Sequence, residues 1–283
     1  MRAIDVHAHP GTKEWYAAMS KYNQAFIDYY KVTPTIKTEE EMTQEYREVD
    51  VKVMMIAWDA EAKTGLPTIS NDFIAKLTER YPDVYLPGWA MVDPWKGEKA
   101  IQEIERAIKE LGLVGVKFQQ VAQAFFPNDR RFYPIYETCA ALKVPVMFHT
   151  GTTGLAAGML GAMGFHLKYT RPIPYIDDVA ADFPNLTIVG AHPSWPWQDE
   201  MIAVVLSKGN VFMELSGWAP RYFPEQLQRE VNGRLQDRVM FGSDYPVISP
   251  LRWLEEFEHG GYRPEVVEKV FYKNAIRIFD LKL

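Results

Sequence analysis

Short apolar segments alternate with helix-like segments along the whole chain. The apolar segments have the near-continuous hydrophobic character of strands that are covered on both faces. They are residues 2–7, 51–57, 84–91, 114–118, 144–149, 186–192, 211–216 and 239–244. The predicted helices are residues 71–80, 97–111, 131–142 and 175–183, with further helical segments at 251–257 and 264–281. Eight strands alternating with helices, with no linker between them, predict an α/β fold, a single (β/α)8 TIM barrel over residues 1–283.

Length and composition agree with one soluble barrel. The chain has 283 residues, of which 47% are hydrophobic and 24% charged, so it can bury a full core. Its net charge of −6 argues against nucleic acid and against an anionic membrane surface as partners. No window approaches the ~20 apolar residues of a membrane span, and the first residues do not resemble a signal peptide. We therefore expect a cytoplasmic enzyme with a small-molecule substrate, assembled as a homodimer or higher homo-oligomer.

One cysteine and one long connection complete the organisation of the chain. Cys139 lies in an apolar helix-like segment, cannot form an internal disulfide and is expected in the core. Residues 11–35 are rich in aromatic side chains and are interpreted as an insertion near the active site, although these aromatics could simply pack it onto the barrel. A helix is expected to begin at Thr38, because Glu41 three residues later completes a capping-box pattern.

Four of the six histidines lie at the ends of predicted strands. His7 and His9 are two residues apart, so the strand period directs both imidazoles to the same side. The alternative is that they are surface residues or the remains of a purification tag, but a tag would not be embedded in an apolar strand. His149 and His192 end the fifth and sixth strands, and Asp244 ends the eighth. The carboxyl ends of barrel strands converge at one mouth, so this pattern predicts a metal site there.

Imidazole nitrogen and carboxylate oxygen favour a borderline divalent ion such as zinc. His7, His9, His149 and Asp244 would supply three nitrogens and one oxygen and leave room for water or substrate. Such an ion lowers the pKa of bound water from ~16 to about 7. Asp244 could also accept the proton of that water, and His192 is better suited to orient the water or shuttle a proton.

These residues lie in motifs that resemble the amidohydrolase superfamily. The similarity is to the amidohydrolase-2 branch, which contains aminocarboxymuconate-semialdehyde decarboxylase and related aromatic-acid decarboxylases. It spans essentially the whole chain, and its motifs are Asp5-Val6-His7-Ala8-His9, Phe148-His149-Thr150-Gly151, Ala191-His192-Pro193 and Phe241-Gly242-Ser243-Asp244-Tyr245-Pro246. The resemblance implies one divalent ion, zinc or manganese, held by His7, His9, His149 and Asp244, with His192 as the acid/base group.

Lys117 ends the fourth predicted strand. In the two-metal branches of the superfamily, a lysine at this place is carboxylated and bridges the ions. The branch resembled here usually works with one ion, so a contact to a substrate carboxylate or a structural ion pair is favoured.

Two reactions fit this set of residues, because the fold does not dictate the substrate. The first is hydrolysis of a small carboxylate or aryl-acyl compound by metal-activated water. The second is non-oxidative decarboxylation of an aromatic or muconate-type acid, which an arginine such as Arg171 or Arg221 would favour by binding the carboxylate. The non-enzymatic alternative is a barrel that binds a metal or ligand as a sensor or scaffold, or a relative that has lost its metal.

Aromatic side chains near the mouth suggest a planar or apolar substrate. They could equally hold loops onto the barrel rim or form a subunit contact. They are Trp58, Trp95, Trp195, Trp197, Trp218 and Tyr245. His166, in a glycine-rich connection, is a further candidate contact, whereas His259 looks like a helix-end residue.

Overall fold

The computed structural model describes residues 1–31 and 35–283, and in this part of the chain eight parallel strands form the barrel wall. The strands are β1 (Ala3–Ala8), β2 (Val51–Met55), β3 (Trp89–Met91), β4 (Gly115–Phe118), β5 (Val146–His149), β6 (Ile188–Ala191), β7 (Val211–Glu214) and β8 (Val239–Met240). β3 to β8 form one continuous ladder, and β1 pairs with β2. Bridges from Ile56 to Trp89 and from Ala8 to Tyr245 close the barrel, which confirms the predicted (β/α)8 fold.

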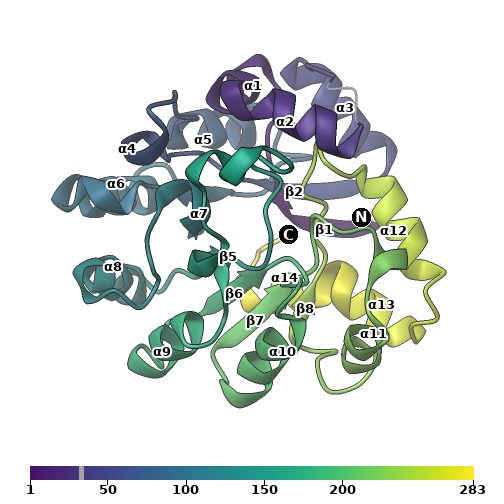
Figure 1. The fold of residues 1–283 in the computed structure, drawn as a ribbon. Coiled ribbons are helices and arrows are strands. Elements are labelled where there is room, and N and C mark those ends of the chain that lie inside the picture. Colours follow the sequence, from purple (N-terminus) through teal and green to yellow (C-terminus); the bar gives the residue numbers. More distant parts are fainter. Residues whose placement is uncertain (32–34) are drawn as a thin grey trace.

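The helices surround the strands as an outer ring (Figure 1). They are α1 (Lys13–Ala18), α2 (Ser20–Tyr30), α3 (Glu39–Glu48), α4 (Glu61–Thr64), α5 (Asn71–Arg80), α6 (Glu98–Lys109), α7 (Gln120–Gln123), α8 (Tyr133–Leu142), α9 (Tyr175–Asp182), α10 (Gln198–Ser207), α11 (Glu225–Val231), α12 (Pro250–Glu258), α13 (Pro264–Glu268) and α14 (Asn274–Ile278). Thr38 caps α3 through the predicted capping box with Glu41. No helix in the described ranges is long and apolar enough to cross a membrane.

Several predicted strands are longer than the observed ones. β3 begins only at Trp89, because Pro87 has no N–H to donate to the ladder. β6 ends before His192, whose left-handed φ of 72° turns the chain out of the ladder. β8 ends already at Met240, and Asp244, the last residue of the predicted strand, has a left-handed φ of 60°. The C-terminal helix predicted at 264–281 is interrupted by a π-helical turn at Lys269–Lys273.

The core fills the barrel and the space beneath the helices. Every residue of β3 to β8 is buried, as expected for a parallel sheet covered on both faces. Cys139 is fully buried, which confirms its predicted place, and burial raises the pKa of its thiol to about 12. The indole of Trp89 donates to the carbonyl of Val6 at 2.9 Å, so this buried polar group is satisfied.

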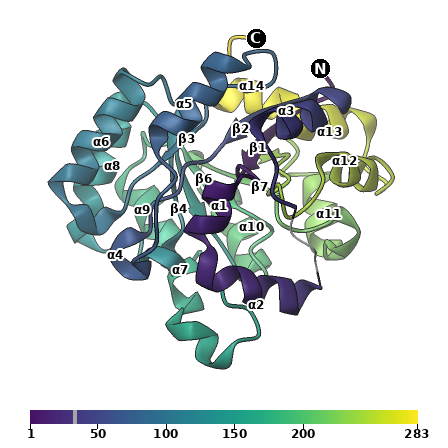
Figure 2. The same cartoon turned by 90° about the horizontal axis from the view of Figure 1, so that it is seen from above.

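The predicted insertion contains α1 and α2, and its residues 32–34 lie outside the described part of the chain. Figure 2 shows both helices on the side of the barrel where α7 and the loop after β5 also lie, opposite to the two termini. Tyr22 of α2 packs against Phe165 of that loop, with ring centroids 4.9 Å apart. Val121 and Ala156 complete this second, smaller apolar cluster. Aromatic packing therefore does attach the insertion to the barrel.

A buried carboxylate joins β1 to the segment that follows β8. Asp5 accepts hydrogen bonds from the N–H of His7 at 3.2 Å and from the N–H of Ser243 at 2.9 Å. It also accepts from the hydroxyls of Ser243 at 2.5 Å and Tyr46 at 2.9 Å. Ser243 in turn accepts from the N–H of Tyr245, so one side chain connects three segments.

We predict that Ser243→Ala lowers the free energy of unfolding by about 2–3 kcal/mol, because it leaves a buried carboxylate oxygen and a buried N–H short of a partner. Urea denaturation of the metal-free protein measures this. Ser249→Ala is the matched control, since Ser249 is exposed and its side chain caps nothing in the described structure; we expect a change within about 0.5 kcal/mol. Equal effects of the two substitutions would contradict the proposed importance of the Asp5 contacts.

Candidate metal centre

Two imidazole nitrogens and one carboxylate oxygen converge where β1 and β8 end. Nε2 of His7 lies 3.4 Å from Oδ1 of Asp244, and Nε2 of His9 lies 3.7 Å from the same oxygen. One ligand atom from each of the three residues lies within 4.8 Å of the other two. The N–H of Asp244 donates to the carbonyl of His7 at 2.8 Å, which holds the carboxylate beside the histidines. This donor set is one that a divalent ion such as zinc would accept.

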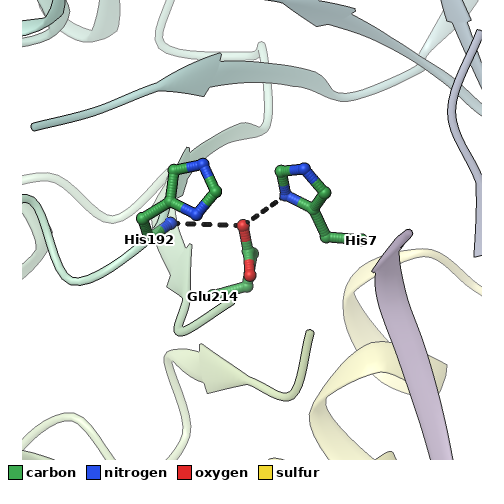
Figure 3. Close-up of side chains that lie close together, drawn as sticks. All are labelled: His7, His192 and Glu214. Atoms are coloured by element: carbon green, nitrogen blue, oxygen red, sulfur yellow. Dashed lines mark hydrogen bonds and ion pairs between the residues drawn. The ribbon is translucent and has the colours of Figure 1, made fainter. Parts of the chain in front are cut away.

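The other nitrogen of His7 is held by Glu214, the last residue of β7. Nδ1 of His7 donates to Oε1 of Glu214 at 2.7 Å, and the N–H of His192 donates to the same oxygen at 3.2 Å (Figure 3). Ser216 adds its N–H to Oε2 at 2.7 Å and its hydroxyl to Oε1 at 3.0 Å. This carboxylate accepts four hydrogen bonds and so fixes the orientation of the His7 ring. Nε2 of His7 then points towards Asp244, where it could bind an ion.

His149 and His192 form a hydrogen-bonded pair next to these donors. Nε2 of His192 lies 3.0 Å from Nδ1 of His149, and Nε2 of His149 lies 2.9 Å from the carbonyl of Thr152. The side chain of Gln120 clamps the backbone of His149 through two hydrogen bonds of 3.0 and 3.1 Å. Three of the four proposed ligands therefore lie together, whereas ligation by His149 would require one of its ring hydrogen bonds to break.

Burial keeps these histidines neutral. It lowers the pKa values of His7, His9 and His192 well below the usual range, and that of His149 to about 3. The positive charge of Lys117 lowers them further. Neutral imidazole is the form that binds a metal ion, so no proton has to leave these rings at neutral pH.

Lys117 is a buried cation beside the candidate ligands. Its side chain is 1% exposed, and Nζ has no hydrogen-bond partner among the described residues. Burial lowers its pKa to about 8, although the nearby charges of Glu214 and Asp244 act in the opposite direction. An unpaired buried ammonium is costly, which indicates that this position serves something other than packing.

The other predicted contacts lie in different surroundings. Trp195 and Trp218 lie side by side, with ring centroids 6.0 Å apart. The hydroxyl of Tyr245 donates to Glu45 at 2.8 Å. Arg171 pairs with Glu200 through hydrogen bonds of 2.6–3.0 Å, so a substrate carboxylate would have to compete with that glutamate.

The remaining candidates lie in loops and at helix ends. Trp58 is 4% exposed and approaches His9 edge-on, whereas Trp95 donates its indole N–H to the carbonyl of Gln123. Arg221 lies 3.8 Å from Glu256. His166 is exposed in the loop after β5, and His259 is the C-cap of α12, as predicted.

Sequence reasoning missed Glu214 and Gln120. The position of Glu214 could have been recognised from the sequence, since a carboxylate at the end of an apolar strand that is buried on both faces needs a hydrogen-bond partner. Nothing in the sequence indicates the role of Gln120, because a glutamine after a strand is common and this one bonds to the backbone of His149. Asp5 was quoted only as part of a motif, although it carries the same signal as Glu214.

Comparison with known proteins places this geometry in context. Residues 4–281 match the family model described as amidohydrolase. A relative in Sphingobium sp., 2-keto-4-carboxy-3-hexenedioate hydratase, is 28% identical over 135 residues, which cover 43% of this chain and 38% of that protein. The alignment thus spans little more than a third of this relative's length.

Solved structures share the fold over almost the whole chain. An uncharacterised TIM-barrel protein from Bordetella bronchiseptica superposes with a TM-score of 0.83 at 24% identity, covering 99% of each chain. A second solved structure is a dihydroxybenzoic acid decarboxylase from Polaromonas sp. with bound manganese and 2-nitroresorcinol. It superposes with a TM-score of 0.65 at 18% identity, covering 99% of this chain and 97% of that one. With a family model matched from residue 4 to residue 281, the chain belongs to the amidohydrolase family.

Proposed function

We propose that this protein is a metal-dependent hydrolase that acts on a small carboxylate or aryl-acyl compound through a metal-activated water. The observation that carries the proposal is the convergence of His7, His9 and Asp244 beside the unpaired ammonium of Lys117. The first three residues would hold the ion, with His149 as the fourth proposed ligand. When bound, the ion would lower the pKa of a coordinated water, which hydrolysis at neutral pH requires.

Asp244 and His192 are the proposed proton-transfer groups. Burial and the charge of Glu214 raise the pKa of Asp244 to about 8, while Lys117 acts to lower it. A carboxylate with a pKa near the working pH can accept a proton and release it again. Nδ1 of His192 lies 2.9 Å from the hydroxyl of Ser216, and its Nε2 contacts His149, so it belongs to a chain along which a proton can move.

Lys117 is the proposed contact for a substrate carboxylate. Its ammonium is buried next to the candidate ligands and lacks a partner in the described chain, and a carboxylate would satisfy it. The indoles of Trp58, Trp195 and Trp218 are proposed to contact a planar part of the substrate. Arg171 and Tyr245 remain weaker proposals, since Glu200 and Glu45 already engage them.

Decarboxylation of an aromatic or muconate-type acid is the second candidate. The decarboxylase from Polaromonas sp. shares the fold, and the unpaired ammonium of Lys117 would bind the carboxylate that is lost. The hydratase relative suggests addition of water as a variant of the first reaction. In this proposal all three reactions would use an ion at the same place, so the ligands do not discriminate between them.

The proposal extends to the ion, the location and the assembly. Two nitrogens and one oxygen support zinc, and the manganese in the Polaromonas structure makes that ion the alternative.

A single buried cysteine fits the reducing cytoplasm, where we propose that residues 1–283 act as one barrel domain. We further propose a homodimer or higher homo-oligomer, which light scattering of the purified chain would measure.

We predict about one divalent ion per chain in protein purified without a tag. His9→Ala and Asp244→Ala should each lower zinc affinity by more than about 100-fold, because each removes a ligand atom rather than an outer partner. Elemental analysis and chelator competition measure this. His259→Ala is the matched control, since that exposed histidine contacts only the carbonyl of Glu255 in the described structure and should leave the metal content unchanged. Metal retention by Asp244→Ala would contradict the ligand assignment.

The zinc affinity should rise with pH up to about 8. Below the raised pKa of Asp244, metal binding must displace one proton from this carboxyl group, so affinity should increase about 10-fold per pH unit between about pH 6 and 7.5. Above about pH 8 it should level off, because the carboxylate is already ionised. The histidines add no further dependence, since their pKa values lie below this window. Chelator competition across pH 6–9 measures the slope, and a flat profile would exclude this role of Asp244.

A panel of small carboxylic acids and aryl esters separates the two reactions. Hydrolysis should yield a new carboxylate, whereas decarboxylation should release carbon dioxide. With the substrate found, Lys117→Met should raise KM by about 10–100-fold, the value of a lost charge-assisted hydrogen bond, while keeping one ion per chain. Loss of the ion in this variant would instead assign Lys117 to the metal site. Lys109→Met, at an exposed ion pair on α6, is the control.

A further inference from the structure

His9 differs from His7 in how its ring is oriented. Nδ1 of His7 donates to the buried carboxylate of Glu214, whereas Nδ1 of His9 is buried without a hydrogen-bond partner among the described residues. A histidine that binds a metal through one nitrogen is usually held by a hydrogen bond at the other. Some other contact must therefore fix the plane of the His9 ring.

That contact is an aromatic stack with Trp15 of α1. The ring centroids of Trp15 and His9 lie 4.3 Å apart, with an angle of 18° between the planes. Trp58 meets both rings edge-on, at 6.0 Å from His9 and 5.6 Å from Trp15, with angles of 77° and 85°. An indole against the face and another against the edge leave the imidazole little freedom to rotate.

The insertion, rather than the barrel wall, sets the position of Trp15. It belongs to α1, and α2 follows directly and contacts two other segments of the same mouth, the loop after β5 and α4. Tyr22 packs on Phe165, and Nζ of Lys21 donates to the carbonyl of Thr64 at 2.7 Å. Trp15 is partly exposed while His9 is buried, so the indole also separates the imidazole from solvent.

We infer that Trp15 is a positioning residue for His9. Its indole holds the imidazole plane so that Nε2 faces Asp244, a task that a hydrogen bond performs for His7. The inference rests on the metal site of the proposed function and adds that this site is complete only when α1 lies against the barrel. Trp15 itself does not ligate the ion, so its effect is on affinity and on coordination geometry.

Cobalt(II) is the probe, because its visible absorption reports both occupancy and geometry. Metal-free wild type, Trp15→Phe and Trp15→Leu are titrated with Co²⁺. Trp15→Phe keeps an aromatic face and should bind within about threefold of wild type. Trp15→Leu keeps apolar volume without a stack and should lose about 10–100-fold in affinity, the range for an outer partner of a ligand, with an altered spectrum. Glu214→Ala removes the hydrogen-bond partner of His7 and serves as the reference for the loss of Co²⁺ affinity when an outer partner of a ligand is removed.

Two controls separate positioning from damage to the fold. Trp95→Leu removes a tryptophan that contacts Gln123 and Phe132 instead of the site, and it should leave the Co²⁺ affinity unchanged. Thermal unfolding of the metal-free variants shows that each chain is folded. In a second measurement, Zn²⁺ should change the tryptophan emission of wild type and of Trp95→Leu, and this change should shrink markedly in Trp15→Phe.

The outcomes distinguish the inference from the proposed function. Equal Co²⁺ affinity and equal spectra in wild type and Trp15→Leu would overturn the role of Trp15 and leave the metal site intact. A loss of equal size in Trp15→Phe and Trp15→Leu would also overturn it, because a stack should be rescued by phenylalanine. No Co²⁺ binding by folded wild type would overturn both proposals.

Discussion

The candidate site depends on the contact between β1 and the segment after β8. His7 and His9 lie near the start of the chain and Asp244 near its end, so the three donors meet only where the barrel closes. The closing contacts include the hydrogen bonds from the N–H of Asp244 to the carbonyl of His7 and from the N–H of His9 to the carbonyl of Tyr245. The N–H and the hydroxyl of Ser243 add two bonds to Asp5. Gly242 is required there, because a Cβ at this position would lie 2.5 Å from Oε2 of Glu214. Backbone and carboxylate contacts thus set the spacing of the ligands before any ion binds.

The same closure creates an electrostatic conflict that a bound ion and substrate would relieve. The site combines four buried neutral histidines, a partly exposed carboxyl group with a raised pKa, and a buried ammonium without a hydrogen-bond partner among the described residues. Groups in this state add little to the stability of the fold, and their arrangement is typical of sites that are preorganised for a charged ligand. A divalent cation would favour ionised Asp244, and an anionic substrate would favour protonated Lys117. The two proposed ligands would therefore each compensate one charge of the site, the ion that of Asp244 and the substrate that of Lys117.

A shared scaffold explains why related proteins carry out different reactions. The hydratase relative and the manganese decarboxylase share sequence or fold with this chain, and in barrels of this kind the loops that follow the strands supply the reacting groups. In this protein Trp15 and Trp58 lie against His9, and Trp195, in the loop after β6, packs beside Trp218, in the loop after β7. Differences in such side chains, rather than in the ligands, are where substrate choice is expected to lie.

The sequence by itself determined the barrel and the candidate ligands, because the barrel follows from local periodicity and the candidates are histidines and a carboxylate at predicted strand ends. Near-continuous apolar segments alternating with amphipathic ones predict parallel strands and helices, and the strand period places His7 and His9 on one side. Only the tertiary structure decided which side chains meet. It paired His7 with Glu214 across 207 residues, turned His149 towards His192, placed Arg171 on Glu200 and laid Trp15 on His9. Such contacts depend on how the barrel closes and on which rotamers the packing allows, and neither is encoded in the spacing of residues along one strand.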